Sequence, residues 1–341
     1  MTQEPNIQSI ASKLLGLGLF LIAAVNVGGE ETEQVAKART EGRVVFYTTM
    51  GIDTVRPVSS AFEKKYPFLK VDVLRGNSET LFNRVIIERQ AGKDQADVVN
   101  NSLMPLLKDK RVLASYGSPE AESFGVKFKD SDGTWVGLVG NYYVIGYNTN
   151  LVPEAVAPRD WTDLTHPRWK GKIALDLEDY DWFGAMLEYL GQEKGKRLME
   201  ALGRQELNWR KGHSLLAQLV GAGEFPVALL YAHRTQLMKD RGAPVNWVKT
   251  SKPIVVSLNA VGILEKAAHP NAARLLLDFL LSPHGQRLLF EGGQIPLRPT
   301  AMPPASSFQP AYLELYPVSG QVMKRLGDYK REYDVDFKTS R

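Results

Sequence analysis

Arg234 is the residue whose type and position point most directly to chemistry. It follows Pro226–Leu230, a run typical of a buried strand, where a guanidinium must reach solvent or find an anionic partner. The guanidinium group offers carboxylates and phosphonates a planar, two-point contact. We therefore predict that Arg234 binds an anionic ligand. The alternative is a surface arginine in a helix over Ala232–Asp240, paired with acids near Asp240.

Polar residues follow several predicted strands, at positions where the loops of a parallel sheet gather. Thr48, Thr49 and Gly51 stand between a strand and a helix, so backbone N–H groups there could meet an anion. Asn77 and the pair Asn101-Ser102 occupy equivalent places, and helix capping explains each of them equally well.

Further candidates lie in the middle of the chain. Asn141 and Tyr142 belong to the β-rich run Trp135–Tyr147, where alternation sends Tyr142 and Tyr143 to opposite faces, so at most one lines a site. We predict Tyr142. The pair His213-Ser214 precedes a helix and caps it or contacts ligand. An acidic cluster is either a solvated helix start or a site for an amine; it contains Asp176, Glu178, Asp179 and Asp181.

Composition removes several classes of function. The 341 residues include 42 Lys+Arg and 38 Asp+Glu without a long run of like charge, so nucleic acid is not a predicted partner. The absence of cysteine excludes disulfides, thiolate metal sites and cysteine nucleophiles. The chain has no HExxH, GxSxG, P-loop or dinucleotide motif, so we predict neither enzyme activity nor a cofactor.

The N-terminus suggests export. Leu14–Val27 is an uncharged, largely apolar run that is too short to span a bilayer comfortably and is followed by small residues. Lys13 is the only basic residue before it, which is weak for a signal peptide, and a buried helix is the alternative. We predict a cleaved signal peptide over residues 1–29 and a periplasmic protein.

These side chains need elements to position them, and from Gly42 the chain alternates short β-branched runs with helical patterns. Strands are predicted at Arg43–Tyr47, Lys70–Leu74 and Ala96–Val99, with helices between them. Later in the chain we predict a buried strand after Pro226 and a long β-rich run. Two helices with proline near their start follow, at His269-Pro270 and Ser282-Pro283. An extended link and a final helix complete the chain. This order predicts an α/β fold with a largely parallel sheet.

The chain resembles the solute-binding proteins of bacterial ABC importers, in the ferric-iron-binding branch with a type II periplasmic-binding-protein fold. The resemblance covers about Val44 to Pro299 and rests on the order of several motifs, among them RVVFYTTMG, GKDQADVV, PRDWTDLTHPRWKGKIAL, GEFPVALL and HPNAARLLLDFLLSPHGQRLL. It implies two lobes joined by crossing strands, with one ligand held in the cleft between them. Residues 42–134 plus 255–292 would form lobe 1, and residues 135–254 plus 293–341 would form lobe 2.

The resemblance also bears on iron. Iron-binding members hold ferric ion with adjacent tyrosines after the GE--AL strand, but here His233-Arg234 stand in that place, with Tyr231 nearby. Ferric ion prefers charged oxygen ligands, so a guanidinium there would repel it. We predict no metal; if iron binds after all, its ligands would come from the four remaining candidates, which are Tyr142, Tyr143, Tyr231 and His233.

The resemblance implies a periplasmic binding protein, a monomer, that captures a small organic anion such as a carboxylate or phosphonate and delivers it to a permease in the inner membrane. A ferric-iron-binding protein, a ligand sensor that feeds a signalling kinase and a transferase on the same fold remain alternatives. The predicted ligand contacts are Thr48, Thr49, Gly51, Asn77, Asn101, Ser102, Asn141, Tyr142, His213, Ser214, Tyr231, His233 and Arg234.

Overall fold

The computed structural model describes residues 32–338, and the predicted signal peptide lies outside them. From Glu33 on, the described chain forms one compact unit. No helix within residues 32–338 is long and apolar enough to cross a membrane.

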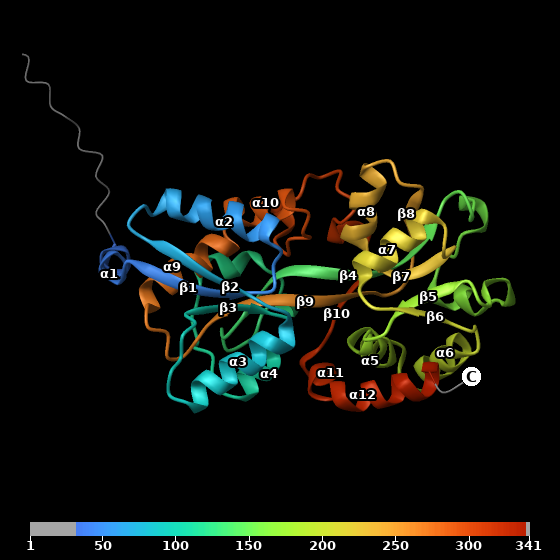
Figure 1. Cartoon of the computed structure of the whole chain (residues 1–341), viewed down its shortest axis with the longest axis horizontal. Helices are drawn as coiled ribbons and strands as arrows, with labels where there is room; N and C mark the ends of the chain where they lie inside the picture. Colours follow the sequence, from blue (N-terminus) through green and yellow to red (C-terminus); the bar gives the residue numbers. More distant parts are fainter. Residues whose placement is uncertain (1–31, 339–341) are drawn as a thin grey trace, which may run out of the picture. The chain divides into compact units, whose positions relative to one another are not determined.

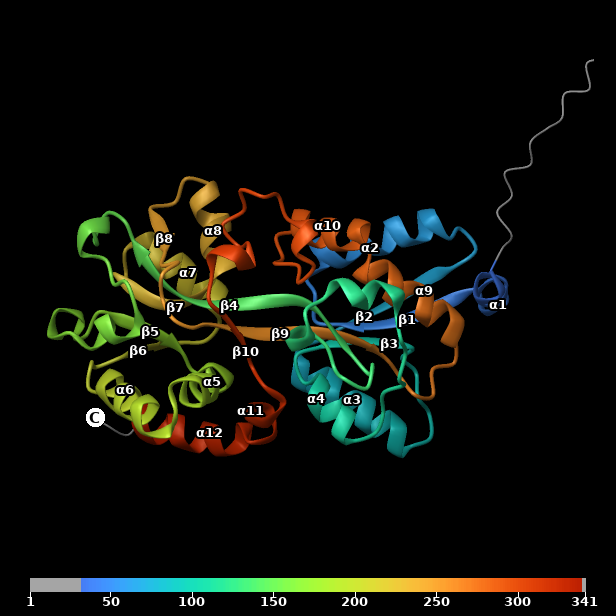
Figure 2. The ribbon, with the colours of Figure 1, turned by 180° about the vertical axis from the view of Figure 1, so that it is seen from behind.

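A ten-stranded mixed sheet forms the centre of this unit (Figures 1 and 2). Eight strands lie in the order β2-β1-β3-β9-β4-β7-β5-β6, while β10 pairs with β9 and β8 pairs with β4. The strands are β1 (Arg43–Thr48), β2 (Lys70–Arg75), β3 (Val98–Asn101), β4 (Val136–Asn148), β5 (Ile173–Asp176), β6 (Asn208–Arg210), β7 (Val227–Tyr231), β8 (Val245–Trp247), β9 (Ile254–Ile263) and β10 (Leu315–Pro317).

Helices cover both faces of the sheet (Figure 1). They are α1 (Glu33–Glu41), α2 (Ile52–Lys65), α3 (Ser78–Gln90), α4 (Met104–Asp109), α5 (Tyr180–Leu190), α6 (Gln192–Gly203), α7 (His213–Ala222), α8 (Ala232–Asp240), α9 (Pro270–Leu281), α10 (Pro283–Glu291), α11 (Gly320–Lys324) and α12 (Leu326–Tyr333). Both α9 and α10 begin at a proline, as predicted, because proline at the first helical position needs no N–H partner.

The predicted parallel sheet is only partly correct. β1 pairs in parallel with β2 and β3, and β5 pairs in parallel with β6 and β7, but β9 and β4 are antiparallel to each other and to their neighbours β3 and β7. Pairing along the long strands β4 and β9 therefore joins the two parallel groups into one sheet.

The C-terminal segment contains more structure than the predicted link and helix. β10 lies parallel to β9, with Tyr316 opposite Val255, and α12 packs against α5. Tyr329 and Tyr333 of α12 pack against Phe183 in the core beside α5. The two-lobe boundaries drawn from the sequence stay a prediction, in which β4 and β9 would be the crossing strands.

Candidate functional site

Parallel strands place their carboxyl ends, and the helix starts that follow, along one edge of a sheet. β6, β7 and β5 end at Arg210, Tyr231 and Asp176. The helices α7 and α8 begin just beyond β6 and β7, and neither start is capped by a side chain. Within residues 32–338, no side chain accepts a hydrogen bond from their first N–H groups, which are therefore available to an anion.

Aromatic and imidazole rings gather at these two helix starts. The Tyr231 ring stacks on the His213 ring with centroids 3.7 Å apart, and it also stacks on His233 at 5.8 Å. Tyr143 of β4 lies directly opposite Tyr231 in the strand pairing and meets its ring edge-on at 5.0 Å. The structure thus brings together the predicted residues His213, Tyr231 and His233, with Tyr143 beside them.

Arg234 follows in the first turn of α8 and is partly buried. Among the described residues, no carboxylate forms an ion pair with its guanidinium group. Asp240, the acid of the alternative interpretation, instead accepts a hydrogen bond from Gln236. Burial lowers the pKa of Arg234, the direction expected of a guanidinium group that is partly removed from water.

His233 is almost completely buried, with 6% of its surface exposed, and its Nδ1 has no hydrogen-bond partner within residues 32–338. Burial, together with the nearby charges of Arg234 and His213, lowers the pKa of His233 to about 3. His233 is therefore neutral at physiological pH, and the positive charge at this helix start belongs to Arg234.

The aspartates of the acidic cluster accept hydrogen bonds from other groups of the protein. Asp179 lies 2.9 Å from His213 Nε2, and Asp181 accepts a 2.7 Å hydrogen bond from the Tyr143 hydroxyl. Asp176 accepts hydrogen bonds from the backbone N–H groups of Glu178 and Gly212. Because these carboxylates already have donors, the cluster orients its neighbours, and the amine-binding interpretation loses its support.

The His213–Asp179 pair sits in the wall of the site. Burial opposes charge on His213, but the carboxylate of Asp179 and those of Asp176 and Asp181 outweigh it, so the pKa of His213 is raised. For Asp179, burial raises the pKa of the carboxyl group, although His213 opposes that effect. His213 Nδ1 has no partner among the described residues, as is true of His233 Nδ1.

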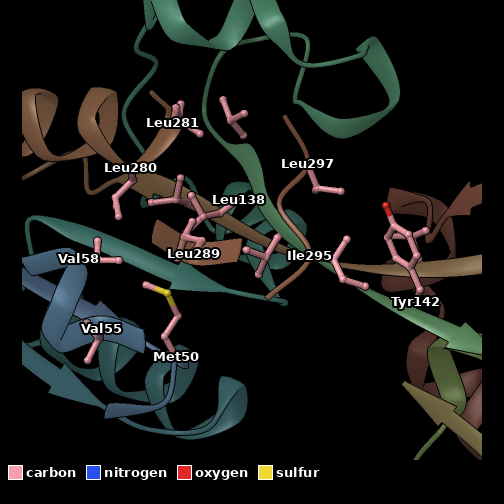
Figure 3. Close-up of a cluster of buried hydrophobic side chains, with 14 of the residues drawn as sticks. Met50, Val55, Val58, Leu138, Tyr142, Leu280, Leu281, Leu289, Ile295 and Leu297 are labelled. Atoms are coloured by element: carbon pink, nitrogen blue, oxygen red, sulfur yellow. The ribbon is translucent and has the colours of Figure 1, made fainter. Parts of the chain in front are cut away.

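Tyr142 faces away from these groups. It is fully buried in the apolar core that also contains Leu138, Ile295 and Leu297, as Figure 3 shows. Strand alternation does separate the two tyrosines, but Tyr143 is the one beside Tyr231. We therefore replace Tyr142 by Tyr143 in the proposed site.

The polar loops of the first sheet group form their own hydrogen-bond network. Thr48 donates to Asn100 at 3.0 Å, and Asn259 of β9 donates to Thr49 at 2.8 Å. Asn100 anchors this network, since it accepts from Thr48 and donates to Asn259. Gly51, the uncapped N-cap residue of α2, is exposed.

Three further predicted contact residues in this group have hydrogen-bond partners within the protein instead. Asn77 caps α3 by accepting from Thr80 N–H at 2.8 Å. Asn101 is fully buried and bonds to the Ser78 carbonyl and to Leu103 N–H. Ser102 also contacts Ser78, through a 2.8 Å bond between the hydroxyl groups. For Asn77 and Asn101, the capping and loop-fixing explanation is therefore sufficient.

Two other predicted contact residues have polar side-chain groups without a hydrogen-bond partner among the described residues. The hydroxyl of Ser214, exposed in the first turn of α7, has no partner within residues 32–338, and the same holds for the partly buried amide of Asn141. No three His, Asp or Glu side chains in this range are gathered so that they could hold a metal ion.

Comparison with known proteins adds a family and a fold. A family model described as "Bacterial extracellular solute-binding protein" matches residues 93–312, more than half of the chain. The chain is 22% identical over 263 residues to an "Fe(3+)-binding periplasmic protein" of Serratia marcescens, covering 74% of this chain and 77% of that protein.

Two solved structures are similar in fold. Iron-bound HitA from Pseudomonas aeruginosa matches with a TM-score of 0.75 and 19% identity, over 85% of this chain and 99% of HitA. The periplasmic binding protein AfuA from Actinobacillus pleuropneumoniae, with exogenous fructose-6-phosphate bound, matches with a TM-score of 0.74 and 23% identity, over 88% of this chain and 100% of AfuA. The described fold is thus that of two-lobed, type II periplasmic binding proteins.

Proposed function

Because the chain belongs to the bacterial extracellular solute-binding proteins, we propose that it captures a small organic anion and delivers it to an ABC importer. The anion would be a carboxylate, a phosphonate or a phosphate ester, held between two lobes. Export by cleavage of residues 1–29 and docking to an inner-membrane permease complete the proposal. Its family and its fold support the transport role, whereas the choice of ligand rests on the site.

Arg234 is the observation that carries the choice of an anion. A guanidinium that is partly buried without a carboxylate partner is costly unless something else neutralises it. The uncapped starts of α7 and α8 lie beside it and add N–H donors and the positive ends of two helix dipoles. His233 is neutral, so it neither adds to the positive charge of Arg234 nor offsets it. An anionic ligand satisfies all of these groups together.

Substitution of Arg234 tests this directly. Each hydrogen bond to a charged group is worth roughly 1.5–3 kcal/mol, so Arg234→Ala should weaken binding of the anion at least about tenfold. Arg234→Lys should recover only part of this loss, because lysine lacks the planar fork. Isothermal titration of the purified protein, using the anion identified by native mass spectrometry of fresh preparations, measures both effects.

Arg241→Ala is the matched control, since Arg241 is exposed at the end of the same helix and has no ion pair among the described residues. It should bind the anion as the wild type does. Wild-type affinity in Arg234→Ala would contradict the proposal that Arg234 holds the ligand.

Ferric iron remains a second candidate because of one observation. The Tyr143 and Tyr231 hydroxyl oxygens lie 3.3 Å apart, and Asp181 contacts the first of them, so three hard oxygen donors are close together. Burial and the nearby carboxylates raise the pKa of both tyrosines well above the ordinary value, which opposes the phenolate form. Titration with ferric citrate that produced a tyrosinate charge-transfer band, without binding of organic anions, would favour iron over the proposed ligand.

A further inference from the structure

A chain of hydrogen bonds runs from the start of α5 to the end of β7. The Asp181 carboxylate accepts from the Tyr143 hydroxyl at 2.7 Å, and the Tyr143 oxygen accepts from the Tyr231 hydroxyl at 3.3 Å. Asp181 also accepts the backbone N–H of Trp182, which fixes the carboxylate. The strand pairing that sets Tyr143 opposite Tyr231 holds the two phenols together.

This chain has a direction because each phenol carries one proton. A carboxylate can only accept, so the Tyr143 proton is used on Asp181. The Tyr143 oxygen can then only accept a hydrogen bond from Tyr231. The single hydroxyl proton of Tyr231 is therefore donated to Tyr143. What Tyr231 offers to anything outside the chain is the lone pairs of its oxygen.

The position of the Tyr231 oxygen is also fixed. Its ring stacks on the His213 ring and on the His233 ring, and Asp179 holds His213 in place by the 2.9 Å contact to Nε2. Tyr231 itself is only partly buried, at the end of β7 where α8 begins, three residues before Arg234. A fixed acceptor and an uncompensated guanidinium therefore stand at the same helix start.

We propose that Tyr231 is a specificity-determining residue that accepts a hydrogen bond from a hydroxyl group of the ligand, while Arg234 and the helix starts bind its anionic group. The ligand class is then hydroxylated organic anions, such as hydroxycarboxylates and polyol phosphates. Asp181 and Tyr143 are positioning residues that give Tyr231 its acceptor character. This inference rests on the proposed function as an anion-binding protein.

Pairs of anions that differ by one hydroxyl group test the inference. Lactate and propionate, malate and succinate, and 2-hydroxypropyl phosphate and propyl phosphate share an anionic group within each pair. Titration calorimetry of the wild type should show the hydroxylated member of the recognised pair binding at least about tenfold more tightly, because its partner leaves the Tyr231 acceptor unsatisfied. In Tyr231→Phe this ratio should fall to about threefold or less, through weaker binding of the hydroxylated member alone.

Tyr143→Phe should also reduce the ratio, because it removes the acceptor of the Tyr231 proton and lets that proton point to the ligand. A purely structural role of Tyr143 would weaken both members of a pair equally. The matched control is Tyr312→Phe, at an exposed tyrosine outside the site, and it should keep the wild-type ratio. Arg234→Ala should weaken both members and leave their ratio unchanged.

Equal binding of both members by the wild type would overturn the inference, even if no variant folds. An unchanged ratio in Tyr231→Phe would overturn it as well. In both cases anions still bind, and the proposed function stands. If the wild type binds no anion of any pair, the anion-binding function fails, and the role of Tyr231 fails with it.

Discussion

Burial is the main influence on the protonation of His233 in this site. The side chain enters the folded state without its charge, since its pKa falls to about 3 from an ordinary value near 6.5. Burial is the main cause, and the charges of Arg234 and His213 act in the same direction. Folding therefore requires a neutral imidazole at position 233.

This predicts a loss of stability in acid. A histidine with a lowered pKa contributes its full stability above pH 6.5 and loses it as the pH falls toward 3. We expect this one group to lower the free energy of unfolding by about 3 kcal/mol between pH 8 and pH 4. His233→Gln should remove that part of the pH dependence, as measured by urea unfolding at both pH values.

The control for this measurement is His284→Gln, at an exposed position on α10. It should keep the acid sensitivity of the wild type. The same slope of stability against pH in the wild type and in His233→Gln would show that His233 does not titrate between these limits.

At the scale of elements, the packing of α12 on α5 depends on a glycine. A Cβ atom at Gly184 would lie 2.5 Å from Tyr329 Cδ2 and 2.9 Å from Val322 Cγ1. Tyr329 is almost completely buried, so its ring has no room to turn aside. The absence of a side chain at position 184 lets the C-terminal helices α11 and α12 pack closely on α5.

Gly184→Ala should therefore destabilise the protein by roughly 1–3 kcal/mol, the usual range for overpacking a core. Gly327→Ala is the matched comparison, because a Cβ atom at Gly327, within α12, would meet nothing within 4 Å. There we expect a gain of roughly 0.4–1 kcal/mol, since alanine restricts the unfolded chain and favours the helix. Chemical denaturation measures both, and equal effects would argue against close packing at Gly184.

At the scale of the whole molecule, the contact between the two predicted lobes on the side of α4 and α11 is weak. Lys324 of α11 lies 3.4 Å from Asp109 of α4, and both side chains are about half exposed, so the pair adds little stability. A cavity of about 560 Å³, lined by α4, β9, β10 and α11, leaves further room between these elements.

Such a contact would not hold this side of the two lobes together without ligand. We expect the open arrangement to dominate in the free protein and the anion to favour closure by bridging the lobes. Small-angle scattering should show a smaller radius of gyration when the anion saturates the wild type. Arg234→Ala at the same anion concentration should show a smaller decrease, because less of it is bound. An unchanged radius in the saturated wild type would contradict closure.

The sequence alone determined the local elements and the family. Periodicity and proline placed the starts of α9 and α10, because these signals act within a few residues. The β-branched runs at Arg43–Tyr47 and Ile254–Leu264 became β1 and β9 for the same reason. The order of motifs along the chain indicated the solute-binding family, which the match over residues 93–312 confirms. Arg234 was selected because its charge and its place after a buried strand are both readable from sequence.

Only the tertiary structure decided which side chains of the site contact each other. Alternation along β4 separates Tyr142 from Tyr143, but the pairing with β7 determines which of them meets Tyr231. The acidic cluster looked solvated, yet Asp181 and Asp179 turn to Tyr143 and His213, which are 38 and 34 positions away in the chain. A local pattern can predict that a residue is buried or polar. It cannot name the partner, because that choice is made by contacts between elements far apart in sequence.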